Sequence, residues 1–306
     1  MVRTFAAADI GSNTAHLLVA ATDGHFVMRI ANTNEWIPLG EVVARQGAIP
    51  GEIVEALVQA MRSFRRVAEK ERAEDMYIFG TEALRTASNS EEVLATIYAA
   101  TGVRVDLISP AREAELSFRG IGLDTRHMGA GLLVEVGGGS AQIARMNGDR
   151  LGPRVSRPIG TGRVIAEANL ANPASPESVL NAREYVRRHL GDGQVTSRNA
   201  LAVLSGGVAR GLWRALHPDG DKRMFPWEID FIARAAERLT VDRIVSRFGV
   251  KPKRAATLLP GALIYSEILQ SFQIEEVIIS EFGVREGAIL EMAAASLKLE
   301  SAPIIT

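Results

Sequence analysis

The chain has 306 residues, 47% of them hydrophobic, and its 35 Lys and Arg nearly balance 36 Asp and Glu. This balance argues against a broad nucleic-acid-binding surface, and the absence of cysteine excludes disulfides and thiolate metal sites. No apolar run reaches the roughly 18–20 residues of a transmembrane helix, and no signal-peptide pattern opens the chain. We therefore expect a soluble, cytoplasmic protein without nucleic-acid or membrane partners.

The first part of the chain predicts three strands followed by alternating helices and strands. Asp23-Gly24 is a hairpin signal between the second and third strands. Helices are expected from Pro50-Gly51, from Ser90 and over 110–121, and strands over 4–10, 15–22, 25–32, 76–80 and 103–108. Residues 34–49 show no clear pattern.

A second series of the same kind starts near residue 131. Strands are expected over 131–136, 141–146, 150–157, 201–205 and 276–280, and helices over 160–171, 176–190, 207–216, 227–239, 241–247, 252–270 and 284–298. The order strand-strand-strand-helix-strand-helix thus occurs twice, which predicts an α/β protein of two lobes with mixed sheets and helices. We expect domains of residues 1–124 and 125–306, joined by the polar, glycine-bearing stretch 122–129.

Two glycine-centred turns are the most informative feature. Each follows an apolar strand that ends with an acidic residue, in Asp9-Ile10-Gly11-Ser12-Asn13-Thr14 and in Glu135-Val136-Gly137-Gly138-Gly139-Ser140. Glycine lets several backbone N–H groups point at one anion, and a carboxylate can hold a divalent metal or position a water. Each turn alone is also compatible with an ordinary hairpin or a flexible loop. Together they favour two lobes that close on one phosphate chain.

Further candidates follow other strands. Thr81 and Arg85 come after a buried strand and are expected to bind phosphate, whereas the alternative is a helical turn with a solvated Arg. Gly206 and Gly207 open a helix and form either an anion niche or a plain connection. Arg285 and Glu286 either cap the closing helix or reach the cleft, where Arg285 would bind phosphate.

Other charged residues give weaker signals. The sequence leaves open whether Glu113 or Glu115 faces a site. We expect His16 to be packed in its strand, and Arg183, Arg187 and Arg188 to form a solvated helix face rather than a polyanion track.

The chain resembles the exopolyphosphatase and guanosine pentaphosphate phosphatase (Ppx/GppA) family, within the actin, hexokinase and Hsp70 superfamily. Six motifs in chain order carry the resemblance: Asp9–Thr14, Thr81–Arg85, Glu113–Ala114, Gly137–Ser140, Ser205–Gly207 and Phe282–Gly287. The resemblance covers nearly the whole chain. It implies two ribonuclease-H-like domains with the active cleft between them, in the short form that lacks further helical domains. Because members often dimerise, a homodimer is expected, although no interface is readable.

The resemblance also implies roles for individual residues. Glu113 is similar to the family's catalytic carboxylate, which activates water for attack on a terminal phosphoryl group of inorganic polyphosphate or guanosine penta- or tetraphosphate. The N–H groups of Gly11 to Asn13 and of Gly138 to Ser140 would hold phosphate oxygens, with Arg85 neutralising another. Asp9 and Glu135 would hold Mg²⁺ or another divalent cation.

The chain departs from the family pattern at two positions. Glu135 stands where the family usually has aspartate, and Gln142 stands where it usually has glutamate. Gln142 supplies neither a charge nor a base. The leading hypothesis is therefore a Mg²⁺-dependent phosphohydrolase, and the alternative is a catalytically weak or inactive protein that binds polyphosphate or alarmones. A superfamily kinase finds no support, because no acceptor-activating aspartate or sugar pocket is identifiable.

Overall fold

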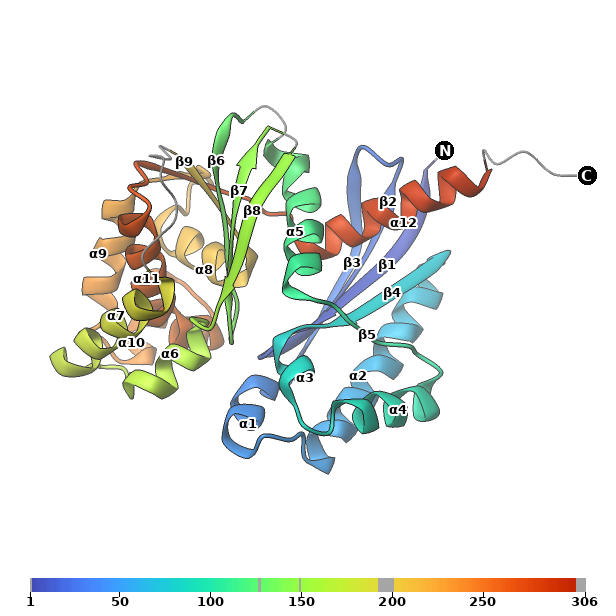
Figure 1. The fold of residues 1–306 in the computed structure, drawn as a ribbon, viewed down its shortest axis with the longest axis horizontal. Helices are drawn as coiled ribbons and strands as arrows, with labels where there is room; N and C mark the ends of the chain where they lie inside the picture. Colours follow the sequence, from blue (N-terminus) through green and yellow to red (C-terminus); the bar gives the residue numbers. More distant parts are fainter. Residues whose placement is uncertain (1, 126–127, 149, 192–200, 301–306) are drawn as a thin grey trace, which may run out of the picture. The chain divides into compact units, whose positions relative to one another are not determined.

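A computed structural model describes residues 2–125, 128–148, 150–191 and 201–300. Contacts divide the chain into two units (Figure 1): the residues up to Leu123 with those from Phe282 onward, and Asp124 to Glu281. None of the helices in the described ranges combines the length and apolar character that a membrane crossing requires.

The first unit is built on a five-stranded mixed sheet in the order β3-β2-β1-β4-β5. The strands are β1 (Arg3–Ile10), β2 (Thr14–Thr22), β3 (Val27–Trp36), β4 (Asp75–Gly80) and β5 (Asp106–Leu107). The first three pair antiparallel, and β4 and β5 extend the sheet in parallel from β1. The helices are α1 (Leu39–Gln46), α2 (Gly51–Lys70), α3 (Glu82–Thr86), α4 (Ser90–Thr101), α5 (Pro110–Thr125) and α12 (Val284–Glu300).

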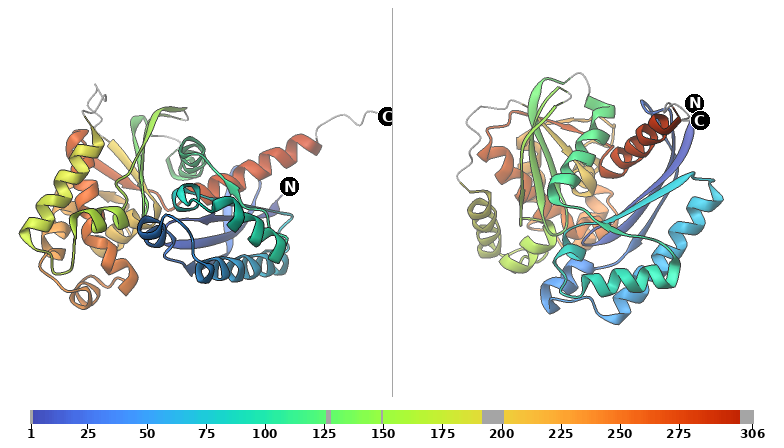
Figure 2. Two further views of the ribbon diagram at one scale, coloured as in Figure 1. Left: turned by 60° about the horizontal axis from the view of Figure 1, so that its bottom comes forward. Right: turned by 45° about the vertical axis from the view of Figure 1, so that its right-hand side comes forward.

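Strand β1 is apolar on both faces because helices cover both sides of the sheet. Ala8 packs in one core with Phe64 of α2, and Ala7 packs in the other with Ile289 of α12. Figure 2 shows α12 and α2 on opposite sides of this sheet. Successive side chains of a strand point to opposite faces, so the alanine run fits a strand buried between two layers.

The second unit contains a six-stranded sheet in the order β10-β11-β9-β6-β7-β8. The strands are β6 (Ala130–Val136), β7 (Ala141–Asn147), β8 (Arg150–Arg157), β9 (Leu201–Ser205), β10 (Arg223–Met224) and β11 (Glu276–Ile279). The helices are α6 (Thr161–Ala168), α7 (Pro176–Leu190), α8 (Gly206–Leu216), α9 (Pro226–Ala236), α10 (Val241–Phe248) and α11 (Pro252–Ser271). Helix α11 lies in the core, where Tyr265 is fully buried.

The predicted duplication is confirmed. In both units three consecutive strands pair antiparallel, a later strand pairs in parallel with the first of the three, and a second later strand pairs in parallel with that added strand. The second unit carries one further antiparallel edge strand, β10. Two mixed sheets flanked by helices are the α/β architecture that the sequence predicts.

The closing helix differs from the expected domain division, which assigned residues 125–306 to the second domain. Contacts instead group α12 with the first unit. The reason is the apolar face of the first sheet, where Phe5 and Leu18 need cover and share a core with Ile289 and Ala293. The chain therefore returns to the first unit after Glu281.

Three local predictions also change. The unassigned stretch 34–49 contains the end of β3 and helix α1, and α3 follows β4. The strand expected over 103–108 is reduced to Asp106–Leu107. Short elements of this kind carry too few periodic residues to be recognised.

The expectation of a solvated face on α7 holds for Arg187 and Arg188, whose side chains are 59% and 66% exposed, and is wrong for Arg183, which is 23% exposed. Arg183 Nη1 lies 2.6 Å from Glu267 Oε1, and Arg187 Nε lies 2.5 Å from Glu267 Oε2. Glu267 belongs to α11 and is 1% exposed. A carboxylate at that depth requires paired charges, and α7 supplies them.

Helices α5 and α12 cross at close range in the first unit. A Cβ on Gly287 would lie 1.8 Å from the Leu116 carbonyl oxygen, and a Cβ on Gly120 would lie 2.0 Å from that of Gly283. Only glycine at both positions allows the backbones to approach so closely. This crossing fixes α5, which carries Glu113.

Candidate active site

Backbone hydrogen bonds from the following segment fix the carbonyl groups of the first glycine turn. Gly11 N donates to the Thr14 carbonyl at 3.0 Å and closes the turn. The Ser12 carbonyl accepts a bond from Gly40 N at 2.6 Å, and the Asn13 carbonyl accepts one from Ile37 N at 3.2 Å. Within the described part of the chain, the N–H groups of Ser12 and Asn13 have no such acceptor, so they are available to an anion.

The second turn has the same construction. Gly137 N donates to the Ser140 carbonyl at 2.9 Å. The first N–H groups of α6 donate back to the turn, Thr161 N to Gly137 at 2.9 Å and Gly162 N to Gly138 at 2.8 Å. The first N–H groups of helix α6 therefore bind the turn and are not available to a ligand.

A glycine makes each close approach possible. A Cβ on Gly40 would lie 2.6 Å from Ser12 Cβ, and one on Gly160 would lie 2.4 Å from the backbone of Gly138 and Gly139. Sequence reasoning missed both glycines. Each of the two glycines follows the third strand of its repeat. A comparison of the two halves of the sequence would therefore have identified them as equivalent positions.

The acidic residue before each turn faces a polar residue on the next strand. Asp9 is opposite His16, and Glu135 is opposite Gln142. Residues directly opposite in an antiparallel pair share a face of the sheet. The buried Gln142 also donates from Nε2 to Ser140 Oγ at 3.0 Å. His16, expected only to be packed, is thus the cross-strand neighbour of Asp9.

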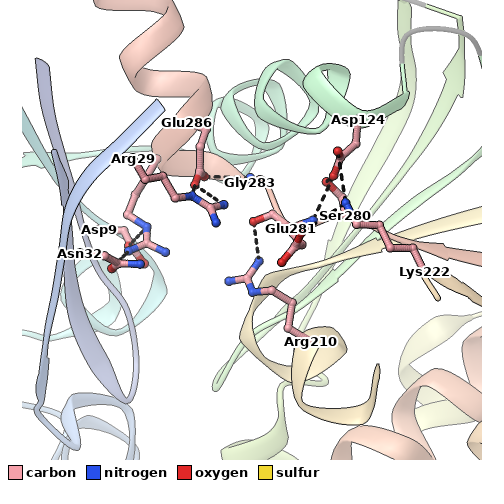
Figure 3. Close-up of polar contacts among 11 residues, drawn as sticks. Asp9, Arg29, Asn32, Asp124, Arg210, Lys222, Ser280, Glu281, Gly283 and Glu286 are labelled. Carbon is pink, nitrogen blue, oxygen red and sulfur yellow. Dashed lines mark hydrogen bonds and ion pairs between the residues drawn. The ribbon is translucent and has the colours of Figure 1, made fainter. Parts of the chain in front are cut away.

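Asp9 forms an ion pair within the first unit. Arg285 Nε lies 3.2 Å from Asp9 Oδ1, with side chains 12% and 22% exposed. Arg285 Nη1 also lies 3.5 Å from Asn32 Oδ1, and Figure 3 shows Asp9 and Asn32 side by side. This ion pair links Asp9 and Arg285, two residues that sequence analysis assigned to metal and phosphate.

Glu135 lies at the end of β6 in the second unit. A Cβ on Gly206 would lie 3.0 Å from Glu135 Oε1, so glycine makes room for this carboxylate. Nearby, the Tyr265 hydroxyl accepts a bond from Val136 N at 3.3 Å and donates to the Ser205 carbonyl at 3.4 Å. Burial, reinforced by the Glu135 charge, raises the pKa of Tyr265, which therefore stays protonated.

These carboxylates suit Mg²⁺ better than an ion enclosed by protein ligands. In the described ranges, no three His, Asp or Glu side chains gather as a metal-binding group. Each unit offers one carboxylate at a strand end, Asp9 or Glu135. Mg²⁺ typically takes one or two carboxylates and completes its shell with water and substrate phosphates, so this donor set fits it.

Gly206 and Gly207 begin α8. The side chain of Arg254 lies against Gly207, and sequence reasoning missed this arginine. A Cβ on Gly207 would lie 2.7 Å from Arg254 Nη1 of α11. Burial, and then the charge of Arg214, lower the pKa of Arg254. No ion pair with Arg254 is formed among the described residues. Arg254 lies at helical spacing from the buried Leu258 and Tyr265. This spacing could have indicated from the sequence that Arg254 is on the inner face of the helix.

Thr81 and Arg85 hold strand ends together in the first unit. Thr81 N donates to the Ile10 carbonyl at 3.1 Å, which joins the end of β4 to the start of the first turn. Arg85 Nη1 donates to the Ile108 carbonyl at 2.6 Å. Arg85 thus has a structural partner, and only its other N–H groups remain for an anion.

Burial distinguishes Glu113 from Glu115 at the start of α5. Ser109 caps the helix, since its Oγ accepts a bond from Arg112 N at 3.1 Å. The Glu113 atom Oε2 is buried, whereas the Glu115 side chain is 45% exposed. Arg112 pairs with Glu291 of α12 and anchors this turn.

Glu286 and Asp124 organise the segments that lead into and out of the second unit. In the first unit, Glu286 accepts bonds from Gly283 N at 3.0 Å and Arg29 Nη2 at 2.8 Å. In the second unit, Asp124 accepts bonds from Ser280 Oγ and Glu281 N, both at 3.2 Å (Figure 3). Of the two capping candidates that the sequence offered, Glu286 caps the closing helix.

A cavity of about 480 Å³ in the first unit lies away from these residues. Asp75 and Tyr77 line it at the beginning of β4, whereas Thr81 follows the end of that strand. Arg112, its link to α5, is already paired with Glu291. We therefore place no site residue there.

The structure thus brings the predicted residues together in two sets. In the first unit, Thr81 bonds to Ile10, which lies in the chain between Asp9 of the Asp9–Arg285 pair and the Gly11–Thr14 turn. Arg85 supports the strand end that precedes Glu113. In the second unit, Gly206 and the Gly137–Ser140 turn flank Glu135.

Residues 18–296 match the sequence pattern of the Ppx/GppA phosphatase family. The chain belongs to this family. It is 32% identical over 301 residues to an uncharacterised protein of Streptomyces coelicolor, covering 92% of this chain and 88% of that protein. It is 28% identical over 298 residues to exopolyphosphatase 1 of Mycobacterium leprae, covering 92% and 87%.

The fold is likewise that of the family. The crystal structure of the Ppx/GppA family member from Aquifex aeolicus aligns with a TM-score of 0.83 at 23% identity, covering 99% of this chain and 100% of that one. The predicted two-domain, actin-like architecture is confirmed. Family membership also confirms the predicted enzyme class, an exopolyphosphatase-type phosphoanhydride hydrolase.

Proposed function

We propose that this enzyme releases terminal orthophosphate from inorganic polyphosphate, with guanosine pentaphosphate as a second substrate of the same chemistry. The main support is the matched construction of the two glycine turns. In both, the turn carbonyls accept hydrogen bonds from backbone N–H groups of a later segment of the same unit. Such turns suit a repeating phosphate chain, which presents the same oxygens along its length. Exopolyphosphatase 1 of Mycobacterium leprae, by its name, acts on polyphosphate.

In the proposed reaction Glu113 is the general base. Its carboxylate takes a proton from water as the water oxygen attacks the terminal phosphorus. The bond from that phosphorus to the bridging oxygen breaks, and the shortened chain leaves with the bridging oxygen. Glu113 is partly buried, which limits the access of bulk water to the base.

The other residues would bind and neutralise the chain. The N–H groups of Ser12 and Asn13, and those of Gly138 to Ser140, would hold phosphate oxygens. Arg285 and Arg254 would supply positive charge. Asp9 and Glu135 would hold Mg²⁺, which when bound would neutralise charge that develops on phosphate oxygens.

The test is phosphate release from long polyphosphate, short polyphosphate and guanosine pentaphosphate, measured side by side with Mg²⁺. Glu113→Gln should lower kcat by at least about a hundredfold. Glu115→Gln is the matched control, because it makes the same change on the same helix at an exposed position. Equal activity of the two variants would remove Glu113 from the mechanism.

Gln142 favours a second candidate function, the binding of polyphosphate or alarmones with little turnover. Its amide lies opposite Glu135 and donates to Ser140, so no second carboxylate stands there. This candidate predicts tight equilibrium binding of polyphosphate and phosphate release no faster than without enzyme. Turnover well above that background eliminates it.

A further inference from the structure

The cavity of about 480 Å³ in the first unit is bounded by β4, β5, α5 and α12, which Figure 1 labels. Tyr77 lines it and packs in the core that α12 covers. Ala288, Met292 and Ala295 form an apolar wall, because residues three, four and seven apart share a face of a helix. Small-molecule sites in proteins have volumes of about 300–1,000 Å³, so the cavity is large enough to hold a ligand.

Two opposite charges face the cavity from the segment that contains β5. Val103 and Val105 enter the core on the other side of the sheet. Arg104 and Asp106 alternate with them and line the cavity. Neither forms an ion pair within the described part of the chain, although they lie only two residues apart.

Asp75 stands at the other end of the cavity, at the start of β4. Phe79 lies four residues further along that strand and pairs with Asp106. Asp75 and Asp106 are therefore separated by about 13 Å along the strands, with Tyr77 midway between them. Burial, and then the charge of Asp106, raise the pKa of Tyr77. The negative charge of Asp106 thus acts on the centre of the cavity.

The lining contains three carboxylates and two guanidinium groups, so one negative charge is in excess. Arg112 of α5 and Glu291 of α12 form an ion pair and neutralise each other. Asp75, Asp106 and Arg104 remain, around a centre of aromatic and aliphatic side chains. A complementary ligand has two cationic groups, one anionic group and an aliphatic chain between its ends.

We propose that this cavity binds a free diamino acid of the lysine type. Arg104 would hold its carboxylate, and Asp106 would hold its α-ammonium group. The aliphatic chain would pass over Tyr77 and Met292, and the terminal ammonium group would reach Asp75. The single net positive charge of such an amino acid balances the excess negative charge of the lining.

Other small ligands match the lining less well. A diamine offers no partner to the guanidinium group of Arg104. A nucleotide or another phosphate ester adds negative charge to a lining in which carboxylates already predominate.

The first test is equilibrium dialysis of the full chain with radiolabelled L-lysine, in competition with three analogues that each lack one group. Norleucine lacks the terminal ammonium group, cadaverine lacks the carboxylate, and ε-aminocaproate lacks the α-ammonium group. Each should bind at least about tenfold more weakly than L-lysine, because each loses a charged hydrogen bond. Absence of L-lysine binding, or an analogue that binds as tightly as L-lysine, overturns the proposal.

The second test places the ligand in the cavity. Asp75→Asn should bind L-lysine and norleucine with equal affinity, because the contact that distinguishes them is lost. Arg104→Gln should likewise bind L-lysine and cadaverine equally. The Asp75 change should preserve the fold, since the asparagine oxygen can keep the bond from Met76 N, now 2.7 Å long.

Asp242→Asn is the matched control, because it makes the same change at an exposed position of the second unit. It should bind L-lysine as tightly as the parent. A preference for L-lysine over norleucine that survives Asp75→Asn, or equal losses in Asp75→Asn and Asp242→Asn, overturns the site.

The cavity lies next to the turn of α5 that carries the proposed base, since Arg112 of its lining directly precedes Glu113. Binding is nevertheless measured without polyphosphate, and Asp75 and Arg104 are outside the candidate active site. A failure of these binding tests therefore leaves the proposed phosphohydrolase reaction intact.

Discussion

Arg285 Nε lies 3.2 Å from Asp9 Oδ1, so a proposed phosphate ligand and a proposed metal ligand form an ion pair. Both side chains are largely buried, which strengthens their attraction relative to a surface pair. Mg²⁺ and Arg285 would therefore compete for the Asp9 carboxylate. Substrate phosphates offer Arg285 an alternative partner.

Arg285→Ala should distinguish the two proposed roles of Arg285, which are competition with Mg²⁺ for Asp9 and binding of a substrate phosphate. Removal of the competing cation should lower the Mg²⁺ concentration needed for half-maximal activity, while the loss of a charged phosphate contact should lower kcat/KM by about 10–100-fold. Arg285→Lys retains the charge and should keep more of the activity. Magnesium titrations of phosphate release measure both effects, and an unchanged or increased Mg²⁺ requirement in Arg285→Ala contradicts the competition.

Gln142→Glu should strengthen metal binding. The new carboxylate would stand opposite Glu135 on the neighbouring strand, where like charges destabilise the sheet without a cation. The variant should therefore unfold at lower temperature without Mg²⁺ and gain more stability than the parent when Mg²⁺ is added. Thermal unfolding with and without Mg²⁺ measures this; Gln142→Ala, which adds no charge, should gain no more than the parent. Equal Mg²⁺ effects in Gln142→Glu and the parent would count against a metal at Glu135.

Arg254→Ala should weaken substrate binding without harming the fold. Burial next to Arg214 lowers the pKa of Arg254, so its charge is costly until an anion arrives. We expect KM for polyphosphate to rise about 10–100-fold, while the free energy of unfolding without substrate stays equal or increases. Steady-state kinetics and denaturant unfolding report the two quantities, with Arg214→Ala as an exposed control. A large loss of stability without substrate would mean that Arg254 is structural.

Gly287→Ala tests the crossing that positions Glu113. A methyl group 1.8 Å from the Leu116 carbonyl oxygen forces α5 and α12 apart, which should lower the free energy of unfolding by about 3 kcal/mol or more. Gly122→Ala on α5 meets no atom within 4 Å. That control should raise the free energy of unfolding by about 0.5–1 kcal/mol. Urea unfolding compares them, and similar values for the two variants would refute the close crossing.

Much of this protein was already determined by its sequence. Apolar strands ending in Asp9 and Glu135 and followed by glycine turns predicted the duplicated sheets, because strand periodicity and turn chemistry are local properties of the chain. The matching turns also predicted phosphate as the ligand. Glu113 came from the family resemblance, since a glutamate in a first helical turn has no distinctive pattern of its own.

Tertiary structure alone decided the contacts between distant segments. Packing of α12 on the first sheet, the approach of Gly40 and Gly160 to the turns, and the position of Arg254 over Gly207 all join residues far apart in the chain. Their sequence signals are weak because a single glycine or arginine is common, and its meaning depends on which backbone lies against it. Burial likewise separated Glu113 from Glu115, since helix position alone does not say what covers a side chain.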